Sequence, residues 1–146
     1  MTIRLATVLD LERLTEMATR FLQETAYGRV CGAAPPERIA PVVSLVLEGG
    51  VGLVAVVGGS LVAFCGLVES EHVLSGERFA DEVALWVEPE YRSGTIGPRL
   101  IRAAEDWARQ RGLSYLKMVA PDGAKLNRFL RRQGYAAVET AYLLRL

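Results

Sequence analysis

The chain has no excess of charge of either sign. Its 17 basic residues balance 17 acidic ones, so the formal net charge of the 146 residues is zero. Proteins that hold nucleic acid or an anionic membrane surface usually do so with a net positive field or a basic stripe. We therefore expect neither nucleic acid nor a membrane as a partner.

Cysteine is scarce as well. The two cysteines, Cys31 and Cys65, lie far apart and lack the spacing of metal ligands. A disulfide framework and a cysteine-based metal site are therefore not expected, and we predict no bound metal. The first residues run directly into a structured pattern without the layout of a signal peptide. We expect both thiols to be reduced. Together with the lack of a signal-peptide pattern, this predicts a cytoplasmic protein.

Charge is absent from one long stretch, Val51 to Val68. Its length meets the minimum for a transmembrane helix. However, Gly58-Gly59 interrupts it, and both halves are rich in valine. Two β-branched runs around a Gly-Gly pair predict a buried hairpin rather than a membrane span.

Apolar periodicity and turn residues predict the remaining elements. Helices are expected over Leu11–Leu22, Ile39–Leu47 (with Pro41 in its first turn) and Pro98–Arg111, and a last one from Pro121-Asp122-Gly123 to the stop at Gly134. Strands are expected at Ile3–Ala6, Val51–Val57, Ser60–Val68, Phe79–Val87, Leu113–Val119 and Ala137–Leu146, with loops at Gln23–Pro36 and Glu69–Arg78. This order predicts one α/β (α+β) domain over residues 1–146. It would consist of a single mixed, mostly antiparallel sheet with helices on both faces.

The most informative segment runs from Val87 to Leu100. The apolar run Val83–Val87 leads into a short turn that contains glycine, and a long amphipathic helix pattern follows. A strand, a tight turn and a helix N-terminus in succession direct backbone N–H groups at one point. The segment therefore predicts a site for a phosphate-bearing ligand.

With these elements in place, the chain resembles the GNAT-type N-acetyltransferase family over nearly its whole length. The lead-in Val87-Glu88-Pro89-Glu90-Tyr91-Arg92 is a common way for such proteins to leave their fourth strand. The family then has Arg or Gln, two residues, Gly, one residue, and Gly or Ala, which here reads Arg92-Ser93-Gly94-Thr95-Ile96-Gly97. Near the end, Phe129–Tyr135 looks like the family's last helix and its Gly-aromatic exit.

The resemblance implies an enzyme that binds acetyl-CoA as co-substrate. The backbone amides of Arg92, Ser93, Gly94, Thr95, Ile96 and Gly97 would hold the pyrophosphate, and the backbone of Trp86 and Val87 would pair with the pantetheine arm. The acetyl group would pass directly to a primary amine of a small molecule or peptide. The sequence leaves the acceptor open.

Two positions depart from the family pattern. Thr95 stands where the family has its middle glycine, and a β-branched residue there would be strained if φ were positive. Our hypothesis is that Gly94 takes the unusual dihedral and that the Thr95 hydroxyl contacts phosphate. Leu130 stands where family members often carry the tyrosine that protonates the departing thiolate.

The general base is predicted to be Glu82, with Asp81 and solvent as alternatives. In many family members an acidic residue at this place takes the proton of the acceptor amine, directly or through water. Strand alternation puts Glu82 on the face opposite Val83, Leu85 and Val87. A plain exposed carboxylate at the strand end is an equally good interpretation of Glu82.

Two alternatives to an enzyme stay open. A non-catalytic module that binds or senses acyl-CoA on the same fold is favoured by the leucine at position 130. A partner-binding protein that no longer binds CoA is favoured by Thr95. A homodimer formed through the last strand is a further possibility.

Overall fold

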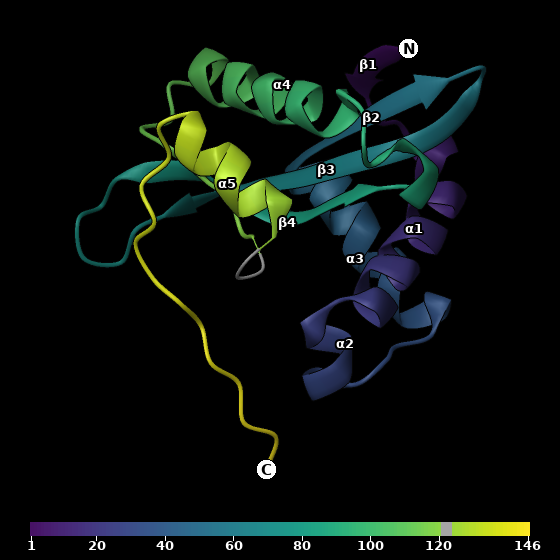
Figure 1. Cartoon of the computed structure of the whole chain (residues 1–146), viewed down its shortest axis with the longest axis horizontal. Helices are drawn as coiled ribbons and strands as arrows, with labels where there is room; N and C mark the ends of the chain where they lie inside the picture. The colour runs from purple at the N-terminus through teal and green to yellow at the C-terminus, as the bar shows by residue number, and fades with distance from the viewer. Residues whose placement is uncertain (121–123) are drawn as a thin grey trace.

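The fold is built on one five-stranded sheet in the order β1-β2-β3-β4-β5 (Figure 1). The computed structural model describes residues 1–120 and 124–146. The strands are β1 Thr2–Leu5, β2 Gly50–Val57, β3 Ser60–Glu71, β4 Arg78–Val87 and β5 Leu116–Lys117. The first four pair antiparallel, and β5 pairs parallel to β4. The predicted mixed, mostly antiparallel sheet is confirmed.

Helices cover both faces of the sheet (Figure 1). They are α1 Leu11–Glu24, α2 Ala26–Cys31, α3 Pro36–Gly49, α4 Ile96–Gln110 and α5 Lys125–Arg132, with 3-10 turns η1 Val8–Asp10 and η2 Pro89–Tyr91. One face packs against α4 through Leu100 and Ala104, which are fully buried with Cys65 and Leu67 of β3. The other packs against α1 through Leu14 and Met17, which meet Phe64 and Trp86.

The uncharged stretch forms the predicted hairpin. Gly58 and Gly59 connect β2 to β3 with φ of 56° and 81°. Positive φ at both central residues is what a tight turn between twisted strands requires, and glycine adopts it without steric cost. No helix in the described part of the chain is long and apolar enough to cross a membrane.

Two helical segments differ from expectation. The predicted loop Gln23–Pro36 contains α2, a short helix that follows Thr25. Helix α3 begins at Pro36 rather than Ile39, so Pro41 lies inside the helix and not in its first turn. Pro36 explains the earlier start, because proline fits the first helical position. The turn Pro121-Asp122-Gly123, predicted to open the last helix, lies outside the described residues.

The predicted final strand, Ala137–Leu146, is wrong. These ten residues form no strand and make no hydrogen bond between backbone groups with any described residue. We call them the C-terminal tail. A strand pattern supplies propensity, but a strand also needs a neighbouring edge to which its backbone bonds. In Figure 1 the tail runs away from the sheet as an extended trace.

The parallel pair β4–β5 separates almost at once. Pairing is limited to Ala80 with Leu116 and Asp81 with Lys117, while β4 continues to Val87. The two strands therefore splay apart beyond Asp81, and we call the gap between them the splay. Within residues 1–120 and 124–146, no strand pairs with the second half of β4 on that side.

Candidate active site

The turn between β4 and α4 presents several unused backbone donors. The N–H groups of Arg92 and Gly94 are engaged, donating to the carbonyls of Pro89 and Tyr91 at 3.3 Å each. Those of Ser93, Thr95, Ile96 and Gly97 have no backbone acceptor in the described part of the chain. Free N–H groups are inherent to the first turn of a helix, which also carries the positive end of the helix dipole. The turn therefore suits an anion.

The backbone of this turn is unstrained. Thr95 precedes α4 with φ −95° and ψ 0°, and the structure has no positive-φ residue in this turn. The hypothesis that Gly94 takes an unusual dihedral is therefore wrong. A β-branched residue at 95 is tolerated because its φ is negative, so the steric objection to a side chain at positive φ does not arise. This removes the conformational objection to CoA binding by this chain.

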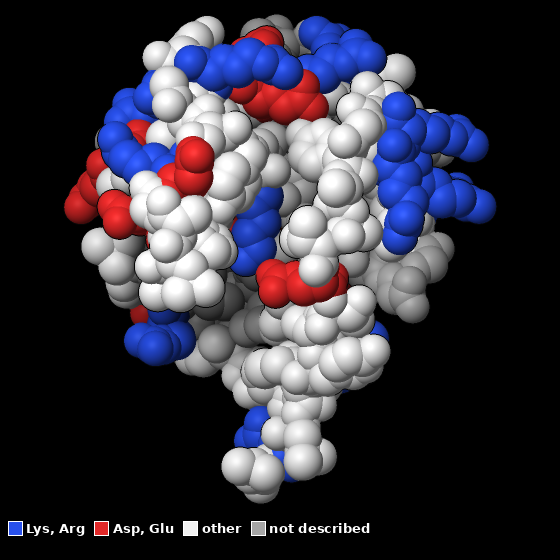
Figure 2. Space-filling model, turned by 90° about the vertical axis from the view of Figure 1, so that its left-hand side faces the viewer, with Lys and Arg blue, Asp and Glu red and all other residues white. Residues whose placement is uncertain are grey.

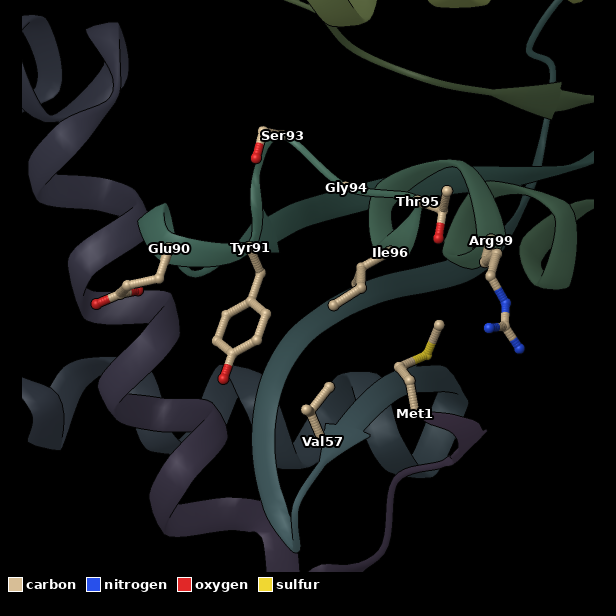
Figure 3. Close-up of a pocket in the computed structure, with 9 residues that line it drawn as sticks. All are labelled: Met1, Val57, Glu90, Tyr91, Ser93, Gly94, Thr95, Ile96 and Arg99. Atoms are coloured by element: carbon tan, nitrogen blue, oxygen red, sulfur yellow. The ribbon is translucent and has the colours of Figure 1, made fainter.

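A hollow of about 370 Å³ lies against the turn (Figure 3). Its wall includes Ser93, Gly94, Thr95 and Ile96, four of the predicted cofactor residues, and Arg99 from the next turn of α4. The remaining lining residues are Met1, Val57, Glu90 and Tyr91. In Figure 3 the Thr95 hydroxyl points into this hollow.

The side chain of Arg92 turns away from the anion donors. Its Nε donates to the carbonyl of Val87 at 2.8 Å, and its Nη2 lies 3.3 Å from Oε2 of Glu24 on α1. The guanidinium stacks over the Trp86 ring, 4.5 Å from the centroid. Arg92 therefore joins the turn to α1.

A second hollow, of about 310 Å³, lies between α1 and the end of β4. Glu88, 5% exposed, accepts from Arg13 at 2.7 Å and from Arg20 at 2.8 Å. Val62 and two residues shared with the first hollow, Glu90 and Tyr91, complete its lining. The two hollows therefore adjoin.

The ladder with β3 determines which β4 backbone groups face the splay. The N–H of Glu88 donates to the carbonyl of Val62 at 2.9 Å. Trp86, two residues before Glu88, is paired with Phe64 of β3. Hydrogen-bonded pairs alternate along an antiparallel ladder. The N–H and C=O of Trp86 therefore point to β3, and those of Leu85 and Val87 point into the splay. The sequence did not indicate Leu85 as a residue whose backbone faces the splay. Which residues of a strand turn their N–H and C=O groups outward depends on the pairing register with β3, which the sequence does not give.

Glu82 lies at the point where β4 and β5 part. Its Oε2 accepts from the N–H of Val119, just beyond β5, at 2.7 Å. The carboxylate therefore spans the gap at the base of the splay. It is neither a free nor a fully exposed strand-end group.

A β-bulge reverses the predicted face of Glu82. Leu67 pairs with Glu82 and Gly66 pairs with Ala84, so Val83 is an extra residue in β4. Paired residues present their side chains on the same face, and Leu67 packs against α4. Glu82 thus shares a face with Leu85, because the bulge interrupts the alternation.

The environment of Glu82 favours its neutral form. Burial raises the pKa of Glu82 to about 7, and the charge of Asp81 adds to this rise. The N–H groups of Val119 and Leu85 act in the opposite direction. A carboxyl group that titrates near neutrality can accept and release a proton at ordinary pH.

The position in α5 at which family members often carry a tyrosine is apolar in this chain. Leu130 is 7% exposed and belongs to the core. The hydroxyl of Tyr135 donates to Glu105 of α4 at 2.8 Å, and burial raises the pKa of this hydroxyl. Tyr91 lines both hollows and is the tyrosine nearest the turn.

The geometry of the turn and the splay agrees with a family comparison. The model of the acetyltransferase (GNAT) family matches residues 15–135. The chain belongs to the GNAT family. A search of curated protein sequences finds no match.

Several solved structures share the fold of this chain. A ribosomal-protein-alanine N-acetyltransferase from Brucella melitensis biovar Abortus 2308 is 24% identical, with TM-score 0.74 and all of both chains covered. AAC(6')-Iy, solved with a bisubstrate analogue of CoA and acetylneamine, is 14% identical with TM-score 0.79, over 99% of this chain and 97% of that one. A transcriptional regulator from Bacillus halodurans C-125 is 20% identical, with TM-score 0.79 and 99% of each chain covered. At these identities the likeness establishes the fold of the GNAT chain.

Within residues 1–120 and 124–146, no three side chains of His, Cys, Asp or Glu gather in a group that could hold a metal ion. The expectation of metal-free chemistry stays a prediction.

Proposed function

We propose that this GNAT chain, acting as one domain over residues 1–146, transfers an acetyl group from acetyl-CoA to a primary amine. The observation that carries the proposal is the set of free N–H groups from Ser93 to Gly97 at the start of α4. A pyrophosphate needs several convergent donors, and these supply four. The open edge of β4 lies beside them.

The donor arm would lie along the splay. The outward C=O of Leu85 and the N–H of Val87 offer strand-like pairing to the pantetheine amides, while the N–H of Leu85 faces the Glu82 carboxylate. Of the two residues predicted for this role, the register favours Val87 over Trp86. A backbone N–H that faces the splay, such as that of Val87, would stabilise the oxyanion that forms when an amine attacks the thioester.

Glu82 would act as the general base. A protonated amine has no lone pair for attack, so its proton must leave first. A carboxylate with a pKa of about 7 is matched to that task near neutral pH. The amine then attacks the acetyl carbonyl, the C–S bond of the tetrahedral intermediate breaks to release CoA as thiolate, and the remaining extra proton on nitrogen passes to solvent or to the thiolate.

The leaving thiolate needs no enzyme acid to be expelled at neutral pH. A thiol has a pKa of roughly 8.5, so its anion is a tolerable leaving group. General acid help contributes about 10²–10⁴-fold. With Leu130 at the family's tyrosine position, the proposed enzyme runs without this contribution or receives it from a group outside α5.

Two measurements test the proposal. Titration with CoA and with acetyl-CoA should raise the melting temperature, because a ligand that binds only the native state stabilises it. Release of free thiol from acetyl-CoA should then depend on one member of a panel of small amines, amino acids, aminoglycosides and peptides. The absence of both effects would refute the proposal.

A second function has one observation in its favour. The burial of Leu130 leaves the expected acid position apolar, which suits a module that binds or senses acyl-CoA without turnover. Stabilisation by acetyl-CoA with no thiol release across the panel would select it.

The expected cytoplasmic location accords with the two unpaired cysteines.

A further inference from the structure

The second hollow, between α1 and the end of β4, contains an arginine with unused donors. Nη1 of Arg20 lies 2.8 Å from Oε2 of the buried Glu88. Its Nε and Nη2 have no acceptor in the part of the chain that the structure describes. These two nitrogens point to the same side of the guanidinium and match the two oxygens of a carboxylate. Arg13, by contrast, is fully engaged by Glu88, Glu16 and the carbonyl of Leu61.

Glu90 brings the opposite charge to this hollow. Its carboxylate is exposed and has no hydrogen-bond or ion-pair partner among the described residues. In Figure 3 its side chain points toward the purple helix on the left, which is α1. The hollow therefore leaves one cationic fork and one carboxylate unsatisfied.

The charges of the lining favour a ligand with both signs. Two guanidinium groups and two carboxylates line the hollow, so its formal charge is zero. A simple anion such as phosphate would meet the charge of Glu90 as well as that of Arg20. A molecule with a carboxylate and an ammonium group meets both unused partners. The volume of about 310 Å³ lies at the lower end of the range for small-molecule sites, about 300–1,000 Å³.

The hollow is distant from the proposed base. Glu88 follows the end of β4, and Glu82 lies six residues earlier in the strand. At about 3.3 Å per residue, the two are roughly 20 Å apart. An amine held by Glu90 therefore cannot pass its proton to Glu82, and this hollow is separate from the acceptor position.

We propose that the second hollow binds a free α-amino acid as an effector. The carboxylate of the amino acid lies on Nε and Nη2 of Arg20, and its ammonium group lies on the carboxylate of Glu90. Val62 and Tyr91 line the remaining wall, against which the side chain of the amino acid lies.

Two residues connect this hollow to the CoA turn. Glu90 and Tyr91 line both hollows. In the first hollow the charge of Glu90 opposes a bound phosphate, and an ammonium group on Glu90 cancels that charge. The amino acid should therefore raise the affinity for CoA, and CoA should raise the affinity for the amino acid by the same factor. Only this coupling rests on the proposed CoA binding.

Thermal unfolding without CoA tests the site, with the standard L-amino acids as probes. At least one of them should raise the melting temperature, because it binds only the native state. The amide of that amino acid, which lacks the carboxylate, and its N-acetyl form, which lacks the ammonium group, should not. The proposal is overturned if no amino acid stabilises the protein, or if the blocked forms stabilise it equally.

Variants assign the stabilisation to the hollow. Arg20→Lys keeps a positive charge beside Glu88 but removes the fork, and Glu90→Gln removes the carboxylate. Each should weaken amino-acid binding about tenfold or more. Glu12→Gln, at an exposed position of α1 outside the hollow, and Glu82→Gln should both bind as the parent does. Loss of binding in Glu82→Gln but not in Arg20→Lys would overturn the proposal, because the amino acid would then be an acceptor.

A basic surface elsewhere needs its own control. Figure 2 shows, at the right of the view, a group of Lys and Arg side chains with no acidic one among them. The exposed positions of α5 are all basic, namely Lys125, Arg128, Arg131 and Arg132. Arg128→Gln should hold the amino acid as tightly as the parent. A loss equal to that of Arg20→Lys would mean unspecific attraction and would overturn the proposal.

Calorimetric titration with CoA tests the effector role. A saturating amino acid should raise the affinity for CoA about twofold to fivefold, the range of an exposed charge interaction. Glu90→Gln should show the same gain without the amino acid and no further response to it. An unchanged affinity for CoA would overturn the effector role. A chain that binds no CoA at all would refute the proposed function, whereas the amino-acid site is decided by the thermal unfolding alone.

Discussion

At the scale of single residues, position along a strand does not determine chemistry. Glu82 and Asp81 are neighbours, yet only Glu82 reaches across the splay to Val119. Asp81 instead lies 3.8 Å from Lys117, its partner on β5. The extra residue Val83 sets the face on which Glu82 lies.

The pKa of Glu82 predicts a pH dependence of stability. Its value rises from 4.5 to about 7 on folding, so the folded state prefers the protonated form. The stabilisation is complete below 4.5 and is lost as the pH rises through 7. We expect Glu82→Gln to flatten the free energy of unfolding over this window, as measured by denaturant titrations at a series of pH values from below 4.5 to above 7. Its acetyl transfer should lose the rise in rate through pH 7.

Asp81→Asn is the control for this assignment. Because the charge of Asp81 raises the pKa of Glu82, the substitution should move both pH transitions toward lower pH. A Glu82→Gln protein with an unchanged rate profile would remove Glu82 from the mechanism.

Thr95 gives a second prediction at this scale. Thr95→Val keeps the branched shape and removes the hydroxyl that points into the hollow (Figure 3). One hydrogen bond contributes about 0.5–1.5 kcal/mol, so CoA affinity should fall by a factor of about 2 to 13 in a calorimetric titration. Thr95→Ser, which keeps the hydroxyl, should bind CoA nearly as the parent does. Equal affinity of Thr95→Val and the parent would remove the hydroxyl from the CoA site.

At the scale of elements, buried charge connects α1 to the end of β4. Glu88 follows Val87 directly, and both Arg13 and Arg20 of α1 hold its carboxylate. Arg92 adds a second link through Glu24. These contacts hold α1 beside the strand end where the turn to α4 begins.

We expect Glu88→Ala to destabilise the protein by about 1–3 kcal/mol. Breaking a fully buried pair costs about 3–5 kcal/mol, and the arginines here are about 40% exposed and can be rehydrated. Thermal and chemical unfolding would measure the loss. Glu90→Ala, an exposed neighbour, should change stability by less than about 0.5 kcal/mol. Equal effects of the two substitutions would show that the arginine contacts contribute nothing.

At the scale of the whole molecule, the sheet separates two apolar clusters. Leu100 of α4 is completely buried on one face, and Met17 of α1 is completely buried on the other. The clusters share no residue, since alternate residues of each strand point to opposite faces.

Leu100→Ala and Met17→Ala should each lower the free energy of unfolding by about 2–5 kcal/mol. Because the two sites lie in separate clusters, the double variant should equal the sum of the single variants within about 0.5 kcal/mol. Leu45→Ala, at a position 66% exposed, is the control and should have little effect. A large departure from the sum would mean that the two faces are coupled through the sheet.

The sequence by itself determined the elements whose signals are local. The Gly58-Gly59 hairpin, the helices α1 and α4 and the stop at Gly134 follow from turn residues and apolar spacing within a few positions. The turn from Arg92 to Gly97 was found in the same way, because its donors are backbone groups that any strand–turn–helix segment exposes.

Only the tertiary structure decided what depends on register and on a neighbouring strand. The bulge at Val83 changes the face of Glu82, and the ladder with β3 selects Leu85 and Val87 over Trp86 for the splay. Residues 137–146 have the sequence pattern of a strand, yet they form none. A sequence pattern shows which face of a strand would be apolar, but it does not show to which sheet edge the strand would pair. Hydrogen bonds between strands join residues far apart in sequence, so their partners are settled by packing of the whole chain.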